Sequence, residues 1–75
     1  MTPFEHLRRL PAPRILLIRP GGIGDVVMML PMLPNLRAAL PQARIEFLTD
    51  PPSIPFLREV PEIDEVLELD RGSTL

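Results

Sequence analysis

The feature that most constrains the fold is an apolar run that passes directly into a glycine-rich turn. Residues 14–19 are predicted to form a strand, because 15–18 are four consecutive aliphatic residues and such an unbroken run is typical of a parallel strand buried on both faces. The turn, residues 20–24, contains three glycines, which let the backbone approach a ligand closely. Ligands of open α/β sheets bind beyond the carboxyl ends of the strands. The sequence therefore predicts a strand–turn–helix unit with a binding site at the turn.

Asp25 directly follows the glycine turn and is the candidate functional acid. It is the only ionisable residue between Arg19 and Arg37. We expect its carboxylate to cap the N-terminus of the following helix, where negative charge is favourable. Arg19, at the end of the strand, is either a surface charge or a second candidate, because a guanidinium can orient an anionic ligand.

The remaining sequence predicts two more strands and two helices. Apolar residues recur at helical spacing from Met29 to Leu40, but Pro31 and Pro34 interrupt them, so we expect a kink or a restart near Pro31. Beyond this helix we predict a strand at 44–49, with Ile45 and Phe47 on one face, followed by a turn at 50–53. We then predict a helix at 54–60 and a strand at 65–69. The residues of this helix that we expect in the core are Phe56, Leu57 and Val60.

This order of elements, β-α-β-α-β, predicts the fold class. Right-handed crossovers give a three-stranded parallel sheet with strand order 3-2-1, which is one half of a Rossmann-like α/β fold. Residues 14–71 are expected to form this partial domain, and residues 72–75 a tail. Residues 1–13 are expected to be a lead-in, with one helical turn that Pro11 and Pro13 stop.

Composition excludes several classes of protein and of site. A chain of 75 residues forms at most one small domain, and its net charge of −2, with no lysine, argues against a nucleic-acid surface. Without cysteine, and with His6 as the only histidine, no zinc site is expected, and we expect neither a metal nor a cofactor. The start lacks the features of a signal peptide, and the longest apolar stretch, 26–34, is too short to span a bilayer. We expect a cytoplasmic protein.

Three interpretations of the glycine turn compete on spacing alone. A dinucleotide fingerprint fails because Val27 occupies its third glycine position, although Asp50 follows the second strand, where a ribose-binding acid would lie. A phosphate-binding Walker loop is excluded because the chain has no lysine. The third interpretation is a tight structural turn that Asp25 caps.

Several segments in order resemble family 9 glycosyltransferases, the lipopolysaccharide heptosyltransferase family. Residues 17–27, followed by Leu30-Pro31, are similar to the opening of these enzymes. The likeness continues through residues 36–41, 43–45 and 61–66, so that it covers about residues 14–71.

The resemblance implies a two-domain GT-B architecture and an inverting sugar transfer that needs no metal. The N-terminal Rossmann-like domain would hold the acceptor. A C-terminal domain, absent here, would hold the nucleotide-sugar donor, which is ADP-heptose in the best-known members. The Asp of the turn, Asp25, would be the general base, and the substrate-binding residues would be Arg19, Gly21, Gly22, Ile23 and Gly24. The family often has His or Thr just before the Leu-Pro pair, where this chain has Met28 and Met29.

The function expected from this resemblance is transfer of a heptose-like sugar to a lipopolysaccharide-type or other glycan acceptor. The chain would be a fragment of such an enzyme, inactive alone, in the cytoplasm or at the membrane periphery. One alternative is a standalone half-Rossmann module that binds a ligand or partner without catalysis. Another is a dinucleotide-binding piece of an oxidoreductase. We also expect the first strand to be an open apolar edge through which the isolated chain self-associates.

Overall fold

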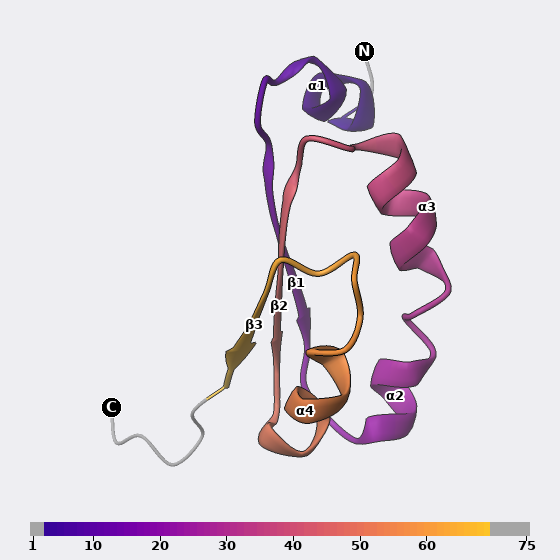
Figure 1. Cartoon of the computed structure of the whole chain (residues 1–75), viewed down its shortest axis with the longest axis vertical. Helices are drawn as coiled ribbons and strands as arrows, with labels where there is room; N and C mark the ends of the chain where they lie inside the picture. The colour runs from indigo at the N-terminus through magenta and orange to yellow at the C-terminus, as the bar shows by residue number, and fades with distance from the viewer. Residues whose placement is uncertain (1–2, 70–75) are drawn as a thin grey trace.

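Three parallel strands form the centre of the computed structural model, which describes residues 3–69 (Figure 1). The strands are β1 (Arg14–Arg19), β2 (Arg44–Thr49) and β3 (Glu65–Glu68). Their order, β1-β2-β3 with both pairs parallel, confirms the predicted 3-2-1 sheet of a Rossmann-like half. The first two strands have the predicted bounds, and the third ends one residue earlier than predicted. The predicted tail lies outside the described residues.

The long apolar segment after β1 forms two helices instead of one. Helix α2 (Ile23–Val27) ends before Pro31, and α3 (Met32–Ala39) begins directly after it, which confirms the predicted restart. Pro34 is tolerated because it lies in the first turn of α3, where backbone N–H groups have no partner within the helix.

The other helices are short. Helix α1 (Pro3–Arg9) precedes β1, and a 3-10 turn, η1 (Pro51–Ser53), leads from β2 into α4 (Ile54–Leu57). Helix α4 is shorter than the predicted 54–60, because residues 58–60 continue it only as hydrogen-bonded turns.

Two clusters of buried residues join the helices to one face of the sheet. Phe47 packs with Val26 and Leu57, and Ile45 packs with Leu40 and Ala43. Both β2 residues are fully buried, which confirms the prediction that they lie on one face of the strand. Of the core residues predicted for α4, Leu57 is buried and Val60 partly so. Phe56 is exposed, so its prediction was wrong.

The opposite face of the sheet is open, which contradicts the prediction that β1 is buried on both faces. Leu16 and Ile18 are 49% and 58% exposed, whereas Ile15 and Leu17 pack against the core. Figure 1 shows α2, α3 and α4 together on one side of the sheet. Both crossovers return over the same face, because consecutive right-handed crossovers in one direction along a sheet place their helices on one side. β1 is also an edge strand among the described residues.

Candidate functional site

The glycine turn joins the end of β1 to α2. Of its three glycines, the first, Gly21, is the one whose replacement the turn would tolerate least. Gly21 has φ +109°, a backbone conformation that other residues rarely adopt. A Cβ built at this position would lie 3.2 Å from Oδ2 of Asp25. At Gly22 and Gly24 an added Cβ would meet nothing within 4 Å. Gly21 is therefore required by the fold of the turn, whereas Gly22 and Gly24 border open space that a ligand can occupy.

Asp25 does not cap α2, and that prediction was wrong. The helix begins at Ile23 with Gly22 as its N-cap, so Asp25 lies inside the first turn. Its carboxylate is 51% exposed, and Oδ1 lies 3.4 Å from Nη2 of Arg19. The structure thus brings together the two charged residues that the sequence nominated for this site.

Two consecutive residues at the end of β2 hold the turn from the neighbouring strand. Arg19 and Thr49 are partners in the parallel register, and the buried Thr49 hydroxyl donates a 2.8 Å hydrogen bond to the Arg19 carbonyl. One residue further on, Oδ2 of Asp50 accepts a 2.6 Å hydrogen bond from the N–H of Gly21. Sequence reasoning missed both contacts.

The hydrogen bond from the Gly21 N–H also changes the interpretation of Asp50. A ribose-binding acid at the end of the second strand must be available to the ligand. Here Asp50 bonds the peptide backbone of the turn, and the third fingerprint glycine is replaced by Val27. The position of Asp50, which had supported the dinucleotide interpretation, is explained by a structural contact.

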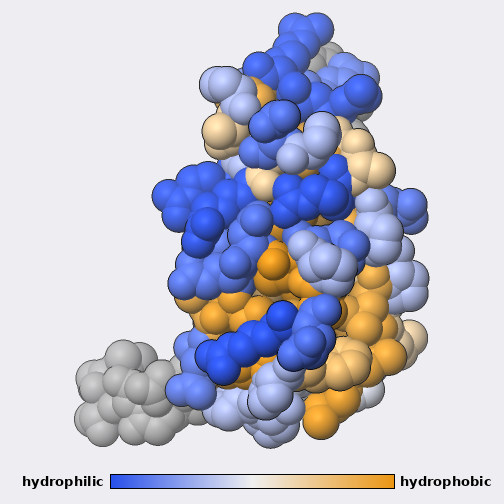
Figure 2. All heavy atoms as spheres, viewed as in Figure 1, coloured by the Kyte–Doolittle hydropathy of each residue, from blue (hydrophilic) through white to orange (hydrophobic). Residues whose placement is uncertain are grey.

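Apolar side chains flank Asp25 on the outer surface of α2. Ile23 and Val27 are exposed, and Met28 is 81% exposed, whereas Met29 packs against the core. Of the two methionines, Met28 therefore lies on the surface beside Asp25, and Met29 belongs to the core. Figure 2 shows hydrophobic side chains gathered over the half of the molecule that carries α2 and α4.

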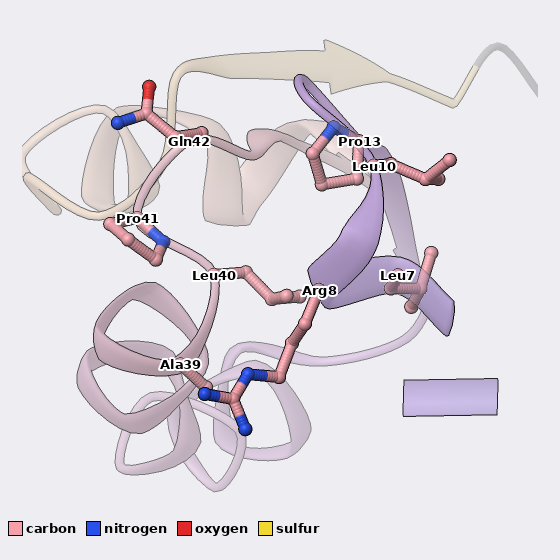
Figure 3. A pocket seen from close by; sticks show the side chains of 8 residues that line it. All are labelled: Leu7, Arg8, Leu10, Pro13, Ala39, Leu40, Pro41 and Gln42. Carbon is pink, nitrogen blue, oxygen red and sulfur yellow. The ribbon is translucent and has the colours of Figure 1, made fainter. Parts of the chain in front are cut away.

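A hollow of about 210 Å³ lies at the opposite end of the sheet, between α1 and the connection from α3 to β2 (Figure 3). This end holds the starts of β1 and β2, whereas ligands of open α/β sheets bind at the carboxyl ends of strands. The glycine turn is therefore the better candidate site. The hollow is lined by Leu7, Arg8, Leu10, Pro13, Ala39, Leu40, Pro41 and Gln42.

Three of the segments that carried the family resemblance meet in a structural anchor and not in the site. Arg37 of α3 donates hydrogen bonds to the carbonyls of Ala43 and Glu62 and to Oδ2 of Asp64. The same Asp64 oxygen accepts a 2.7 Å hydrogen bond from the N–H of Ile45, at the start of β2. The Ile45 N–H and the Arg37 guanidinium together lower the pKa of Asp64.

Residues 3–69 contain neither a group of metal-ligating side chains nor a membrane-spanning helix. In this part of the chain no three His, Cys, Asp or Glu side chains are grouped so that they could hold a metal ion. No helix within the same range is long and apolar enough to cross a membrane.

Comparison with known proteins gives a match to one solved structure. The chain is similar to the crystal structure of the glycosyl transferase family 9 from Veillonella parvula DSM 2008, with 30% sequence identity and a TM-score of 0.75. The similarity covers 81% of this chain but only 18% of that chain, so the 75 residues correspond to a small part of that protein. No protein-family model matches the chain, and no curated protein matches it.

Proposed function

We propose that this chain is the acceptor-side, N-terminal part of a family 9 glycosyltransferase and that Asp25 is the catalytic base of that enzyme. The observation that carries the proposal is the exposed Asp25 carboxylate, paired with Arg19 at the carboxyl end of β1. It supports the proposal because the fold around it is similar to a family 9 protein at 30% identity.

The proposed chemistry is an inverting displacement at the anomeric carbon of a nucleotide-sugar. A hydroxyl oxygen of the acceptor attacks this carbon, and the bond between the carbon and the diphosphate oxygen breaks. The electron pair of that bond leaves with the nucleoside diphosphate. Asp25 takes the proton from the attacking hydroxyl as the new glycosidic bond forms. The proposal includes no metal ion, as the family resemblance implies.

The other residues of the turn would bind the acceptor. The open space at Gly22 and Gly24 leaves the backbone beside Ile23 accessible to a sugar ring. Arg19 remains partly exposed while it contacts Asp25, so its guanidinium can also reach an anionic group of the acceptor. Gly21 contributes the shape of the turn.

The family resemblance extends the proposal to the substrates. The donor would be a heptose-like sugar on ADP, held by a second domain that these 75 residues do not include, and the acceptor would be a lipopolysaccharide-type or other glycan. The reaction would take place in the cytoplasm, at the periphery of the inner membrane.

The proposal is tested in a chimaera in which this chain replaces the matching N-terminal segment of the Veillonella parvula protein. With the nucleotide-sugar and acceptor that the parent protein uses, release of nucleoside diphosphate is measured. Asp25→Asn keeps the shape of the side chain, and kcat should fall about 10²–10⁴-fold. Glu68→Gln, an exposed carboxylate at the end of β3, is the matched control. Near-normal turnover by the Asp25→Asn chimaera would overturn the assignment.

The oxidoreductase alternative is separated from this proposal by nucleotide affinity. Because Val27 replaces a fingerprint glycine and Asp50 bonds to Gly21, we expect no useful affinity of the 75-residue chain for NAD. Calorimetric titration with NAD and with ADP-sugars measures this. Low-micromolar binding of NAD would favour the oxidoreductase.

A further inference from the structure

We infer that Asp50 is a positioning residue that fixes the Asp25 carboxylate through the backbone of Gly21. The inference rests on the proposed function, since it assigns Asp50 a role in the reaction that Asp25 would catalyse. The contact itself is a 2.6 Å hydrogen bond from the Gly21 N–H to Oδ2 of Asp50. Hydrogen bonds to an ionised acceptor are shorter and stronger than those between neutral groups.

The backbone of Asp50 is restricted on both sides of the residue. Asp50 precedes Pro51, and a residue before proline is restricted to extended conformations. Its φ of −75° and ψ of 153° are of this kind. Thr49, the residue before it, is fully buried in β2. Asp50 is therefore held between a buried strand residue and a proline.

Few other contacts fix the backbone of the glycine turn at its start. Pro20 has no N–H, so Gly21 carries the first backbone donor after the strand. Thr49 fixes the carbonyl of Arg19, and Asp50 fixes the N–H of Gly21, on either side of Pro20. The end of β2 thus sets the path of the turn at two points.

The position of Gly21 in turn limits where Asp25 can lie. The Cβ that Gly21 lacks would be 3.2 Å from Oδ2 of Asp25, so the carboxylate packs close to the Gly21 backbone. On the other side, Oδ1 of Asp25 contacts Arg19, whose carbonyl is bonded to Thr49. The carboxylate therefore lies between two residues that are both tied to the end of β2. Without Asp50, the Gly21 peptide can rotate and this arrangement loosens.

NMR tests the positioning without any substrate, in the 75-residue chain carrying Leu16→Lys to place a charge on the exposed β1 and limit self-association. In Asp50→Ala we expect amide exchange at Gly21 to become about 10-fold faster and the ¹³Cγ resonance of Asp25 to shift or broaden. Asp50→Asn keeps an acceptor oxygen and should restore most of the protection at Gly21. Glu68→Ala, the matched control on the register partner of Thr49, should change neither signal. Unchanged Gly21 exchange and Asp25 resonance in both Asp50 variants would overturn the inference.

Measurements of kcat and KM in the chimaera complete the test. Asp50→Ala should lower kcat about 10-fold with little change in KM, because it displaces the base and leaves the acceptor contacts in place. Unaltered kcat would also overturn the positioning role. Failure of the proposed function has a different signature: Asp25→Asn would then retain turnover, whereas the NMR response of Gly21 to Asp50→Ala would persist.

Discussion

The guanidinium of Arg37 lies 2.8 Å from Oδ2 of Asp64 and joins α3 to the segment that enters β3. Through its bonds to the carbonyls of Ala43 and Glu62, the same side chain also ties together two loops at the starts of β2 and β3. One side chain therefore connects a helix with the amino ends of two strands.

Arg37→Ala should destabilise the chain by roughly 1–3 kcal/mol, because two backbone carbonyls and one carboxylate lose a partly buried partner. Urea denaturation followed by circular dichroism measures this. Arg58→Ala removes an exposed arginine at the end of α4 and should change stability by no more than about 0.5 kcal/mol. Equal stability of the two variants would contradict the anchoring role.

The Asp64 carboxylate makes the free energy of unfolding depend on pH in the acid range. The Ile45 N–H and Arg37 lower its folded-state pKa below the ordinary value of 3.8, so the folded protein binds this proton less readily than the unfolded chain. Its contribution is complete above pH 3.8 and is lost as the pH falls through the lowered pKa. Urea midpoints measured on the acid side of 3.8 should fall more steeply for the unmodified chain than for Asp64→Asn. Parallel curves would contradict this.

Gly21 and Gly24 should respond differently to the same substitution. Gly21→Ala forces a side chain onto a backbone with φ +109° and towards Asp25, which should cost roughly 1–3 kcal/mol of folding stability. Gly24→Ala places its methyl group in open space inside α2, so stability should be unchanged or up to about 1 kcal/mol higher. Thermal melts compare the two variants.

In the chimaera, Gly24→Ala should nevertheless weaken acceptor use, because the methyl group enters the space proposed for the sugar. A rise in the KM for the acceptor, without loss of stability, would distinguish a binding surface from a structural turn. An unchanged KM would contradict the assignment of Gly24 to the acceptor site.

The open edge of the sheet should lead the isolated chain to self-associate. β1 is an edge strand among the described residues, and it exposes Leu16 and Ile18. Sedimentation at micromolar concentration should show species larger than a monomer. Leu16→Lys places a charge on this strand opposite Glu46, its register partner, and should shift the chain towards monomer. A single monomeric species of the unmodified chain would contradict the prediction.

Local sequence patterns predicted the elements of the fold well. Both ends of β1 and β2 could be placed because arginine, proline or threonine residues lie directly on either side of their apolar residues. Pro31 marked the helix restart because proline is unfavourable inside a helix. The start of α2 was misplaced because Gly22, without any side-chain oxygen, occupies the N-cap in place of Asp25.

Features that depend on distant residues could not be predicted in the same way. The exposure of Leu16 and Ile18 depends on which face the crossovers return over, and an unbroken aliphatic run does not encode this. The contact between Gly21 and Asp50 joins residues 29 positions apart and depends on the register of β1 and β2. Asp25 and Arg19 could both be nominated from sequence, whereas the contacts of Thr49 and Asp50 that hold their turn could not.

The hydrogen bond between Gly21 and Asp50 links two segments that proline has already stiffened, since Pro20 precedes one residue and Pro51 follows the other. Proline restricts the unfolded chain as well as the folded one, so less conformational entropy is lost when these segments become ordered. That loss occurs when the chain folds and not when a ligand binds. A ligand at the turn would therefore meet a surface of fixed shape, and little of its binding free energy would be consumed in ordering the protein.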